Sequence, residues 1–537
     1  MAPVWLPVLV VCAELLIAGQ TRLWDRDEAR YGQATAEMIA SGDYLVPTFN
    51  GEPRLHKPPL IYWLMSLAVR AVGPREEAFR FFSCLALGGT CLLTYQIGRR
   101  LLSREAGLWA MAILASSAMP IYLGAAATTD SVLLFLTTAQ MAIFLRLASS
   151  GGRARDVILL GLAMGGSFLT KGPAGLLPAM VMFAVMASDR RATGVRRAVP
   201  GVGLGLAIGA AIFLAWAIPA NHATGGAFLR VGVGFHVIER SLTPLEGHGG
   251  GIAAFLFYYP VVVLVGCVPW AGALPAAISS VVGGRVGDAE FRRIVVCWAV
   301  VPVAAMACVQ TKLPHYIAPV MPALALAVGG ALARWRQSAP DARDARWLWP
   351  VLRADLVVTM GAGLALIIVP PYLGVPGLWA PSAVAGAIAM LGAGAFFLRF
   401  KSGVGRLALG TLVGTILFLV PVVFGVMPAL DAIKLGPALG EDVRALAGRG
   451  ENVAFIGQQE PTSHFYAGRR IDALETAAEV QEWLRRNPGG LLVVSRGTKD
   501  LLEKITGPLA ADTVSSRRGF NYAKGEWSDG LVLRARP

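Results

Sequence analysis

Apolar segments alternate with short charged loops along most of this chain. A helix needs about 20 residues to cross roughly 30 Å of hydrocarbon, and apolar runs near that length recur up to residue 430. The pattern predicts about thirteen membrane-spanning helices. They lie near residues 3–20, 79–98, 104–123, 131–147, 156–170, 174–188, 199–219, 252–280, 294–309, 315–332, 354–370, 377–398 and 407–428. The pair on either side of Lys171 could instead form one re-entrant feature.

The pattern changes after residue 430. Apolar runs at 452–456 and 491–495 are typical of buried strands, and 476–486 has the spacing of an amphipathic helix. Such alternation predicts a small α/β fold. We therefore divide the chain into a membrane domain of residues 1–430 and a soluble α/β domain of residues 431–537.

Composition supports a membrane protein and excludes other classes. Of the 537 residues, 55% are hydrophobic and 15% charged, and the mean hydropathy is +0.58, which excludes an ordinary soluble domain. The net charge of +14 does not indicate a nucleic-acid partner, because the arginines form short clusters between apolar runs. All six cysteines lie in or beside apolar runs, so neither a disulfide framework nor a cysteine metal site is predicted.

The arginine clusters indicate the orientation of the helices. They occupy one set of alternate loops, near residues 99–104, 146–155, 190–197, 285–293, 334–346 and 399–406. Because strongly basic loops stay in the cytoplasm, we expect the opposite loops and the C-terminal domain on the outer side. These outer loops are 21–78, 220–251 and the turns near 125–130, 171 and 310–315.

The first outer loop carries the densest group of charges. Asp27-Glu28-Ala29-Arg30-Tyr31 opens an amphipathic helix that runs to Ile39 and is expected to lie in the membrane interface. Lys57 follows His56 and precedes two prolines, which stiffen the segment. A carboxylate, a guanidinium and an ammonium beside a membrane suit a site for a lipid-linked phosphate. The alternative is structural: charges that stabilise a helix end, and a lysine that reaches for the membrane surface.

Other outer turns carry single polar residues. Asp130 begins the fourth span, where an N-cap is the alternative interpretation. Lys171 lies on a tight turn, and Lys312 stands shortly before His315 and Tyr316. Because all of them lie opposite the arginine clusters, we expect them to face one outward cavity.

Histidines concentrate in the outer loop at 220–251, which holds three of the six in the chain. His236 and Arg240 are four residues apart and share a face if the segment is helical. Together with His56, the histidines could bind a divalent metal ion. Hydrogen bonding within the loop is the alternative.

Taken in order, these motifs resemble one family. The motifs are Trp24 with Asp27-Glu28-x-Arg30-Tyr31, then Gly42-Asp43-Tyr44, Lys57-Pro58-Pro59, Thr129-Asp130, Lys171-Gly172-Pro173, His236-x3-Arg240 and Lys312-Leu313-Pro314-His315-Tyr316. The combination resembles the bacterial lipid A aminoarabinose transferases and their relatives among the polyprenyl-phosphate-sugar glycosyltransferases, which include protein O-mannosyltransferases. The resemblance covers the membrane part well, and the C-terminal domain only by position and size.

The resemblance implies a fold, a location and residue roles. The fold is a helical membrane fold of the GT-C type with interfacial helices in the first outer loop. The location is the bacterial inner membrane, with the active site and the C-terminal domain in the periplasm. Asp27 is implied as the catalytic carboxylate and Asp130 as a second acidic residue of the site. Arg30, Lys57 and Tyr316 are implied to hold the phosphate of the undecaprenyl-phosphate carrier, and the further substrate-binding candidates are Tyr31, Lys171, Arg240 and Lys312.

The resemblance also implies a zinc site, with one departure. In the family a Glu commonly precedes the Lys-Pro-Pro motif and binds zinc together with the histidine that matches His236. In this chain His56 stands at that position. Since histidine also ligates zinc, His56 and His236 are the expected ligands, and no nucleotide cofactor is expected.

The combined residues predict a membrane glycosyltransferase that moves a sugar from undecaprenyl phosphate to lipid A, as in aminoarabinose modification, or to another amphipathic acceptor. The main alternative acts on protein or polysaccharide hydroxyls. A lipid flippase or transporter is disfavoured, because we identify no ionisable residue well inside a span and no inverted repeat. A non-catalytic assembly component is a third possibility. The sequence leaves the sugar open among aminoarabinose, galacturonate, a hexosamine and a neutral hexose.

Overall fold

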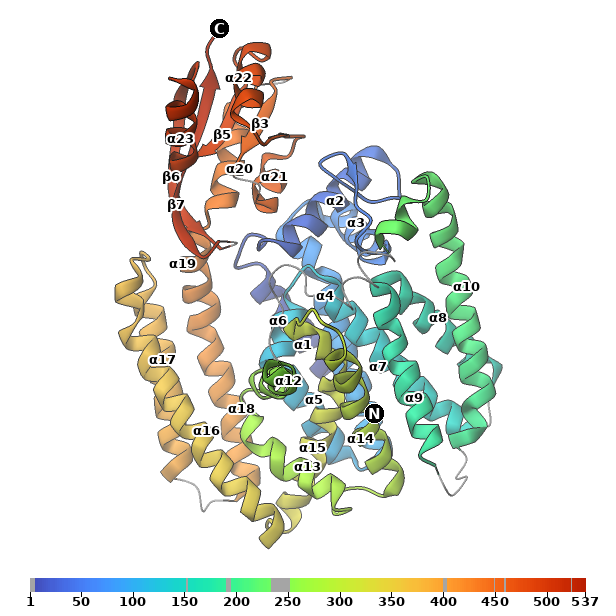
Figure 1. The fold of residues 1–537 in the computed structure, drawn as a ribbon. Coiled ribbons are helices and arrows are strands. Elements are labelled where there is room, and N and C mark those ends of the chain that lie inside the picture. The colour runs from blue at the N-terminus through green and yellow to red at the C-terminus, as the bar shows by residue number, and fades with distance from the viewer. Residues whose placement is uncertain are drawn as a thin grey trace.

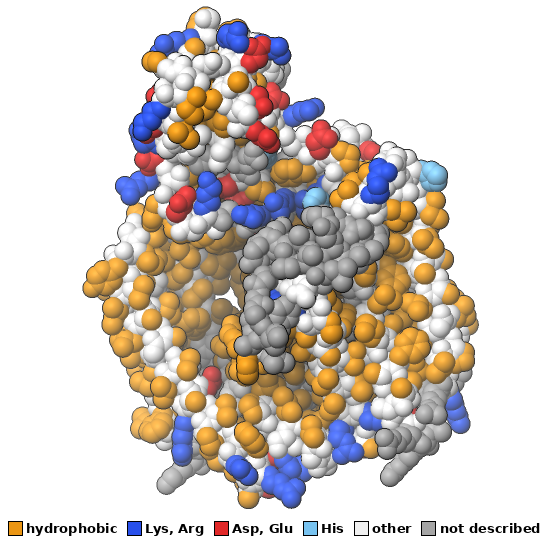
Figure 2. All heavy atoms as spheres, in the orientation of Figure 1, with side chains coloured by type: hydrophobic (Ala, Val, Ile, Leu, Met, Phe, Trp, Pro, Cys, Tyr) orange, Lys and Arg blue, Asp and Glu red, His pale blue; other side chains and the backbone are white. Residues whose placement is uncertain are grey.

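The computed structural model describes residues 5–150, 153–189, 195–232, 252–398, 403–448, 450–457, 460–522 and 524–537. Helices make up most of it, and a β-sheet gathers towards the C-terminus (Figure 1). A broad band of hydrophobic side chains covers the helical part, and charged side chains gather at its two ends (Figure 2). The chain is therefore a multi-pass membrane protein, and its predicted helical character is confirmed.

Eight helices of the described part are long and apolar enough to cross a membrane, or up to nine if the bent pair α5 and α6 forms one span. Four shorter apolar helices have 10–17 residues, so the number of about thirteen spans stays a prediction. The helices of the membrane part are α1 (Trp5–Ala18), α4 (Glu76–Leu101), α5 (Arg104–Ala115), α6 (Ala118–Gly124), α7 (Thr129–Ser150), α8 (Ala154–Lys171), α9 (Leu177–Ala187), α10 (Val199–Ala223), α12 (Ile252–Gly266), α13 (Leu274–Val282), α14 (Ala289–Ala307), α15 (Met321–Gln337), α16 (Ala342–Ile368), α17 (Trp379–Leu398), α18 (Val404–Pro421) and α19 (Met427–Ala432).

The first outer loop folds into α2 (Asp27–Ser41), a short hairpin of β1 (Thr48–Phe49) and β2 (Glu52–Pro53), and α3 (Leu60–Val72). The predicted helix start at Asp27 is confirmed. Tyr31, Ala34 and Met38 form the buried face of α2, as their helical spacing predicts. Gly42 ends the helix with φ +73°, a left-handed conformation that favours glycine.

The chain reverses direction after Lys171. Here α8 ends, and η1 (Gly172–Leu176) connects it to α9. A Cβ added to Gly175 would lie 2.9 Å from Ser167, whereas residues eight apart in a straight helix are about 12 Å apart. The tight turn predicted at Lys171 is therefore present, within the stretch Ala154–Ala187 that is counted once among the eight.

A buried ion pair holds the start of α2 to α4. Glu28 and Arg80 are 5% and 1% exposed, respectively. Arg80 donates from Nε and Nη2 to the two carboxylate oxygens of Glu28, at 2.9 and 2.6 Å. Its guanidinium also donates to the carbonyls of Ala18, Thr21 and Arg22, at 2.5, 2.7 and 3.2 Å. Arg80 thereby caps the end of α1 and fixes the segment that leads to α2.

The same carboxylate reaches the turn between α6 and α7. Glu28 accepts hydrogen bonds from the N–H groups of Trp24 and Ala127, at 2.8 and 2.5 Å. Burial alone would raise the pKa of Glu28, but the Arg80 guanidinium and these two donors hold it below its ordinary value. Because Ala127 lies just before α7, Glu28 fixes the start of α2 relative to the start of α7.

One carboxylic acid lies inside a predicted span. Glu14, in α1, is 2% exposed, and its Oε2 has no hydrogen-bond partner among the described residues. The expectation of no ionisable residue well inside a span is therefore wrong. The sequence argument missed it because a single Glu among aliphatic neighbours changes the apolar pattern very little.

The C-terminal part contains a five-stranded sheet in the order β4-β3-β5-β7-β6. β3 is parallel to β4 and β5, and β7 is antiparallel to β5 and β6. The two predicted strands correspond to β3 and β5, and the helical pattern corresponds to α22. The elements are α20 (Leu435–Leu446), β3 (Val453–Ile456), α21 (Pro461–Ala467), β4 (Asp472–Leu474), α22 (Ala477–Arg486), β5 (Leu491–Ser495), α23 (Arg496–Thr506), β6 (Ala511–Asn521) and β7 (Glu526–Ala535). The domain boundary at 430/431 stays a prediction.

The sheet and its helices, residues 435–535, are called the sheet domain below. It contacts the first outer loop through α21 and the segment after it. Tyr466 Oη accepts a hydrogen bond from the Leu23 N–H at 2.8 Å and donates one to Glu76 at 2.9 Å. The side chain of Asn50, at the hairpin turn, forms two hydrogen bonds with the backbone of Ile471, at 2.7 and 2.9 Å. The sheet domain therefore holds both ends of the loop that carries the predicted site.

Two carboxyl groups lie at this contact, one partly buried and one buried. Asp25 accepts hydrogen bonds from the N–H and the hydroxyl of Thr462, at 2.9 and 2.5 Å. Glu460 is 6% exposed, and its Oε1 has no hydrogen-bond partner in the described part of the chain. Burial and the neighbouring Asp25 raise the pKa of Glu460 to about 7, and burial also raises the pKa of Asp25.

Replacing Arg80 with Met should destabilise the protein, because it leaves the Glu28 carboxylate buried without its counter-ion. The expected loss in the free energy of unfolding is about 3–5 kcal/mol, measured as a lower unfolding temperature of the detergent-solubilised protein. The double variant Glu28→Gln/Arg80→Met should recover part of the loss, since neither charge remains. Equal losses in the single and double variants would contradict the role of the charge.

Glu460→Gln should stabilise the protein at alkaline pH. The pKa of the carboxyl is 4.5 in the unfolded chain and about 7 in the folded one, so ionisation costs the folded state stability as pH rises between these values. At pH 8 the variant should gain on the order of 2–3 kcal/mol, and near pH 4 the two proteins should unfold alike. A gain independent of pH, or an equal gain for the exposed Glu52→Gln, would contradict this assignment.

Candidate functional site

Two neighbouring acids at the start of α2 have opposite environments. Glu28 is buried in its ion pair, whereas the side chain of Asp27 is 63% exposed. Arg30 Nη1 lies 4.0 Å from Asp27 Oδ1, and its side chain is 38% exposed. Asp27 and Arg30 can therefore meet a ligand, while Glu28 acts in the structure.

Asp130 and Lys171 form a second pair, which brings α7 and α8 together. Lys171 Nζ lies 2.5 Å from Asp130 Oδ1, and the side chains are 12% and 9% exposed. The same ammonium lies 5.1 Å from the centre of the Tyr316 ring, at a distance typical of a cation–π contact. The structure thus brings together three residues that the sequence predicted for one outward site.

Electrostatic coupling connects these groups to the first outer loop. Asp130 lies within range of the ionisable groups of His315, Lys171 and Lys57. His315, which precedes Tyr316 in η5 (Pro314–Val320), also interacts with Asp27. The start of α2, the loop before α3, the start of α7, the end of α8 and η5 therefore contribute to one site.

A buried arginine that the sequence analysis did not single out lies beside these groups. Arg54 is 8% exposed; its Nε donates to Tyr62 Oη at 3.0 Å, and its Cζ lies 5.4 Å from the Tyr31 ring centre. Tyr31 is buried, and burial raises its pKa well above the ordinary value. Asp27 contributes to the electrostatic environment of Arg54, so the guanidinium belongs to the same site.

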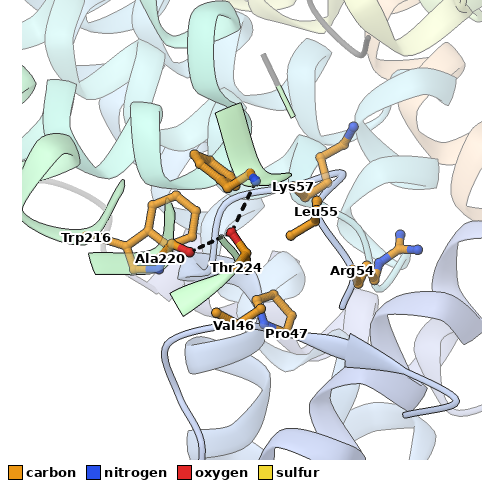
Figure 3. Close-up of a pocket in the computed structure, with 9 residues that line it drawn as sticks. Val46, Pro47, Arg54, Leu55, Lys57, Trp216, Ala220 and Thr224 are labelled. Atoms are coloured by element: carbon orange, nitrogen blue, oxygen red, sulfur yellow. Dashed lines mark hydrogen bonds between the residues drawn. The ribbon is translucent and has the colours of Figure 1, made fainter. Parts of the chain in front are cut away.

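The segment from Arg54 to Lys57 separates this site from a small apolar cavity. Figure 3 shows Arg54 and Lys57 extending on the same side of the segment, away from Trp216 and Ala220 across the cavity. Trp216 also donates a hydrogen bond from Nε1 to the Leu45 carbonyl at 2.9 Å. Arg54 and Lys57 thus line one side of the cavity, while their charged ends extend away from its Trp216 side (Figure 3).

Lys312 has a structural position in this chain. Its Nζ lies 3.1, 2.6 and 2.6 Å from the carbonyl oxygens of Met306, Ala307 and Val309, at the end of α14 and just after it. Ammonium groups stabilise helix C-termini in this way. The substrate-binding role of Lys312 stays a prediction, and the observed contacts are those of a helix cap.

The predicted metal ligands are only partly described. His56 is exposed in the loop before α3, whereas His236 and Arg240 lie outside the described residues. Within the described ranges, no group of three or more His, Cys, Asp or Glu side chains is arranged to hold a metal ion. The described residues alone do not form a zinc site, so no step of the chemistry is assigned to a metal.

The arrangement suits the chemistry of a phosphorylated ligand. An exposed carboxylate, Asp27, faces a site that also contains Arg30, Arg54, Lys57 and Lys171. Guanidinium and ammonium groups stabilise phosphate charge, and in a partly dry site they do so more strongly than in water. Such a site can bind a phosphodiester and stabilise a departing phosphate while a carboxylate acts on the other reactant.

Comparisons with known proteins agree with this chemistry. The model of the family described as dolichyl-phosphate-mannose-protein mannosyltransferase matches residues 56–218. The undecaprenyl phosphate-alpha-4-amino-4-deoxy-L-arabinose arabinosyl transferase of Edwardsiella ictaluri is 31% identical over 364 residues, which cover 66% of this chain and 63% of that protein. The corresponding transferase of Pseudomonas aeruginosa strain UCBPP-PA14 is 33% identical over 323 residues, 58% of this chain and 56% of that protein. The match thus spans less than two thirds of the length of these relatives.

The fold is also similar to solved structures. ArnT from Cupriavidus metallidurans, solved with bound undecaprenyl phosphate, superimposes with a TM-score of 0.77 at 20% identity, covering 99% of this chain and 98% of that one. Its apo structure gives a TM-score of 0.76, also at 20% identity, over 99% and 97% of the two chains. The similarity includes the C-terminal sheet domain as well as the helices. The chain is thus similar in sequence to the aminoarabinose transferases over part of their length, and similar in fold to the solved ArnT structures over nearly its whole length.

Proposed function

We propose that the chain is an integral membrane glycosyltransferase that moves a sugar from an undecaprenyl-phosphate carrier to lipid A or another amphipathic acceptor. The observation that carries the proposal is the exposed Asp27 carboxylate in a site with Arg30, Lys57 and the paired Lys171. The names of the homologous transferases support an aminoarabinose-type donor.

The reaction first requires that the negative charge on the departing phosphate be stabilised. The acceptor oxygen attacks the anomeric carbon, the bond from that carbon to the phosphate oxygen breaks, and its electron pair stays on undecaprenyl phosphate. Arg30, Lys57 and Tyr316 are proposed to stabilise this charge through hydrogen bonds. Lys171 would assist from beside Tyr316, where Asp130 fixes its ammonium.

The acceptor sets the role of Asp27. A hydroxyl acceptor must lose its proton, and Asp27 would accept it as general base. A lipid A phosphate is already anionic, so there Asp27 would orient the acceptor or stabilise positive charge on the sugar. Direct attack opposite the leaving phosphate inverts the anomeric centre in either case.

The sidedness of the site is part of the proposal. The clusters near residues 99–104, 285–293 and 334–346 mark the cytoplasmic ends of the helices. The site and the sheet domain would then face the periplasm of a bacterial inner membrane. The carrier and the acceptor would reach the site from the outer leaflet. Binding of a metal by His56 and His236 stays a prediction.

Asp27→Asn should abolish transfer while leaving donor binding intact. The amide keeps the size of the side chain but loses the charge and the basicity, and loss of such a group typically costs 10²–10⁴-fold in rate. The measurement is a reconstituted assay with purified protein, undecaprenyl-phosphate sugars and lipid A, with products identified by mass spectrometry.

The matched control is Glu52→Gln, which removes an exposed carboxylate from the hairpin of the same loop and should retain normal turnover. Turnover of Asp27→Asn within a few-fold of wild type would remove Asp27 from the mechanism. Absence of transfer by the wild type with every donor, despite carrier binding, would contradict the proposed activity and favour lipid transport.

A further inference from the structure

Arg54 is a buried cation that forms no salt bridge in the part of the chain that the structure describes. Its contacts there are the Tyr62 hydroxyl and the Tyr31 ring, and no carboxylate lies within ion-pairing distance of it. Arg54 is only 8% exposed. Its Nη atoms, however, are not sealed from solvent. The outer edge of the guanidinium therefore remains open to a ligand.

This arrangement differs from that of the other buried arginine of the region. Arg80 has its N–H groups matched by Glu28 and three carbonyls. A buried charge costs several kcal/mol unless hydrogen bonds and an opposite charge offset it. The Tyr31 ring and the hydrogen bond to the Tyr62 hydroxyl offset only part of this cost for Arg54. An anion that reaches the open edge would supply the rest.

The fold holds Arg54 in place instead of letting it turn towards water. Its N–H donates to the Pro47 carbonyl at 2.7 Å, across the hairpin. Glu37 accepts hydrogen bonds from the Thr48 hydroxyl and the N–H groups of Asn50 and Gly51, at 2.6, 2.6 and 3.1 Å. The hairpin that positions Arg54 is thus fixed to α2, and through Asn50 to the sheet domain.

We propose that Arg54 binds a second anionic group, distinct from the phosphate of the carrier. The inference rests on the proposed function, which assigns the carrier phosphate to Arg30, Lys57 and Tyr316. Arg54 extends on the same side as Lys57 (Figure 3) and interacts with Asp27, so its ligand lies beside the reacting centre. A carboxylate or a phosphate fits the planar fork of a guanidinium.

Two parts of the reactants can supply this anion. A uronic acid on the donor would place its carboxylate on Arg54, and such a donor would make the chain a transferase of acidic sugars. Alternatively, a phosphate of the acceptor would bind there and be positioned for attack near Asp27. In both cases Arg54 selects a substrate by its charge.

The test compares Arg54→Gln and Arg54→Lys with the wild type in the reconstituted assay. The donors are undecaprenyl-phosphate-linked galacturonate and aminoarabinose, and the acceptors are lipid A with two phosphates and with one. Arg54→Gln should raise KM at least tenfold for the substrate whose anion it binds and leave the other unchanged, with Arg54→Lys in between. An effect confined to the galacturonate donor assigns the anion to the sugar, and one confined to the doubly phosphorylated acceptor assigns it to the acceptor.

Arg70→Gln is the matched control, because Arg70 is exposed and lies 5.3 Å from the Tyr44 ring centre, a contact similar to that of Arg54 with Tyr31. This control should keep wild-type KM values. Unchanged KM values in Arg54→Gln for all four substrates would overturn the inference. Equal increases for all four, with a lower unfolding temperature, would also overturn it and assign Arg54 a structural role.

A binding measurement separates this inference from the proposed function. With undecaprenyl phosphate already bound at the carrier site, sodium galacturonate or inorganic phosphate, added at constant ionic strength, should raise the unfolding temperature of the wild type and of Arg70→Gln but not of Arg54→Gln. This outcome would support the anion site even if no donor were turned over. Equal shifts in all three proteins would contradict it even if the transferase activity were established.

Discussion

The buried pair of Glu28 and Arg80 is the interaction on which the rest of the site depends. A guanidinium has five N–H groups, and those of Arg80 find five acceptors: two oxygens of Glu28 and three carbonyls at the end of α1 and after it. Replacing such a pair with apolar residues is often neutral for stability. Its value here lies in geometry, because one rigid group connects α1, α2, α4 and the turn before α7.

This pair also explains why two adjacent acids have different roles. Successive residues of a helix point about 100° apart, so when Glu28 faces Arg80 in the interior, Asp27 faces outward. The Trp24 and Ala127 N–H groups fix the orientation further. Asp27 thus occupies a defined position without being held by strong bonds of its own. A defined position and the absence of strong bonds both suit a group that must contact a substrate.

The sequence predicted the helices and turns of this site better than it predicted which side chains contact one another there. Helical spacing placed the start of α2 at Asp27, and the turn at Lys171 followed from the glycine and proline after it. The arginine clusters placed Asp130 and Lys171 on the same face of the helices, and their ion pair confirms that they lie together, whereas the side of the membrane on which this face lies stays a prediction. These predictions succeeded because each depends on a short stretch of chain or on a simple alternation.

The side-chain pairs of the site form between residues far apart in the sequence, which no local pattern predicts. Glu28 and Arg80 are 52 residues apart, and Asn50 and Ile471 are 421 apart. The burial of Arg54 requires the hairpin and two tyrosines, although its sequence surroundings resemble an exposed turn. Lys312 has the same kind of sequence setting as Lys171, but it ends up on the carbonyls of α14. Residue type and sidedness therefore identify candidates, and only tertiary packing separates caps from ligands.

The ion pairs differ in strength according to their roles, since the structural pair is buried and the pair in the site is exposed. Glu28 and Arg80 are dry and connected at 2.6 Å, so neither charge can leave without a large cost. Asp27 and Arg30 are 4.0 Å apart and exposed, a pairing worth little in water, so breaking this pair costs a phosphate ligand little. Arg54 stands between these cases: the protein has already buried most of its guanidinium, so a ligand that supplies the anion meets a cation that needs little further desolvation. The weak pair thus suits the carrier phosphate of the proposed reaction, and the pre-buried charge suits the second anion inferred for Arg54.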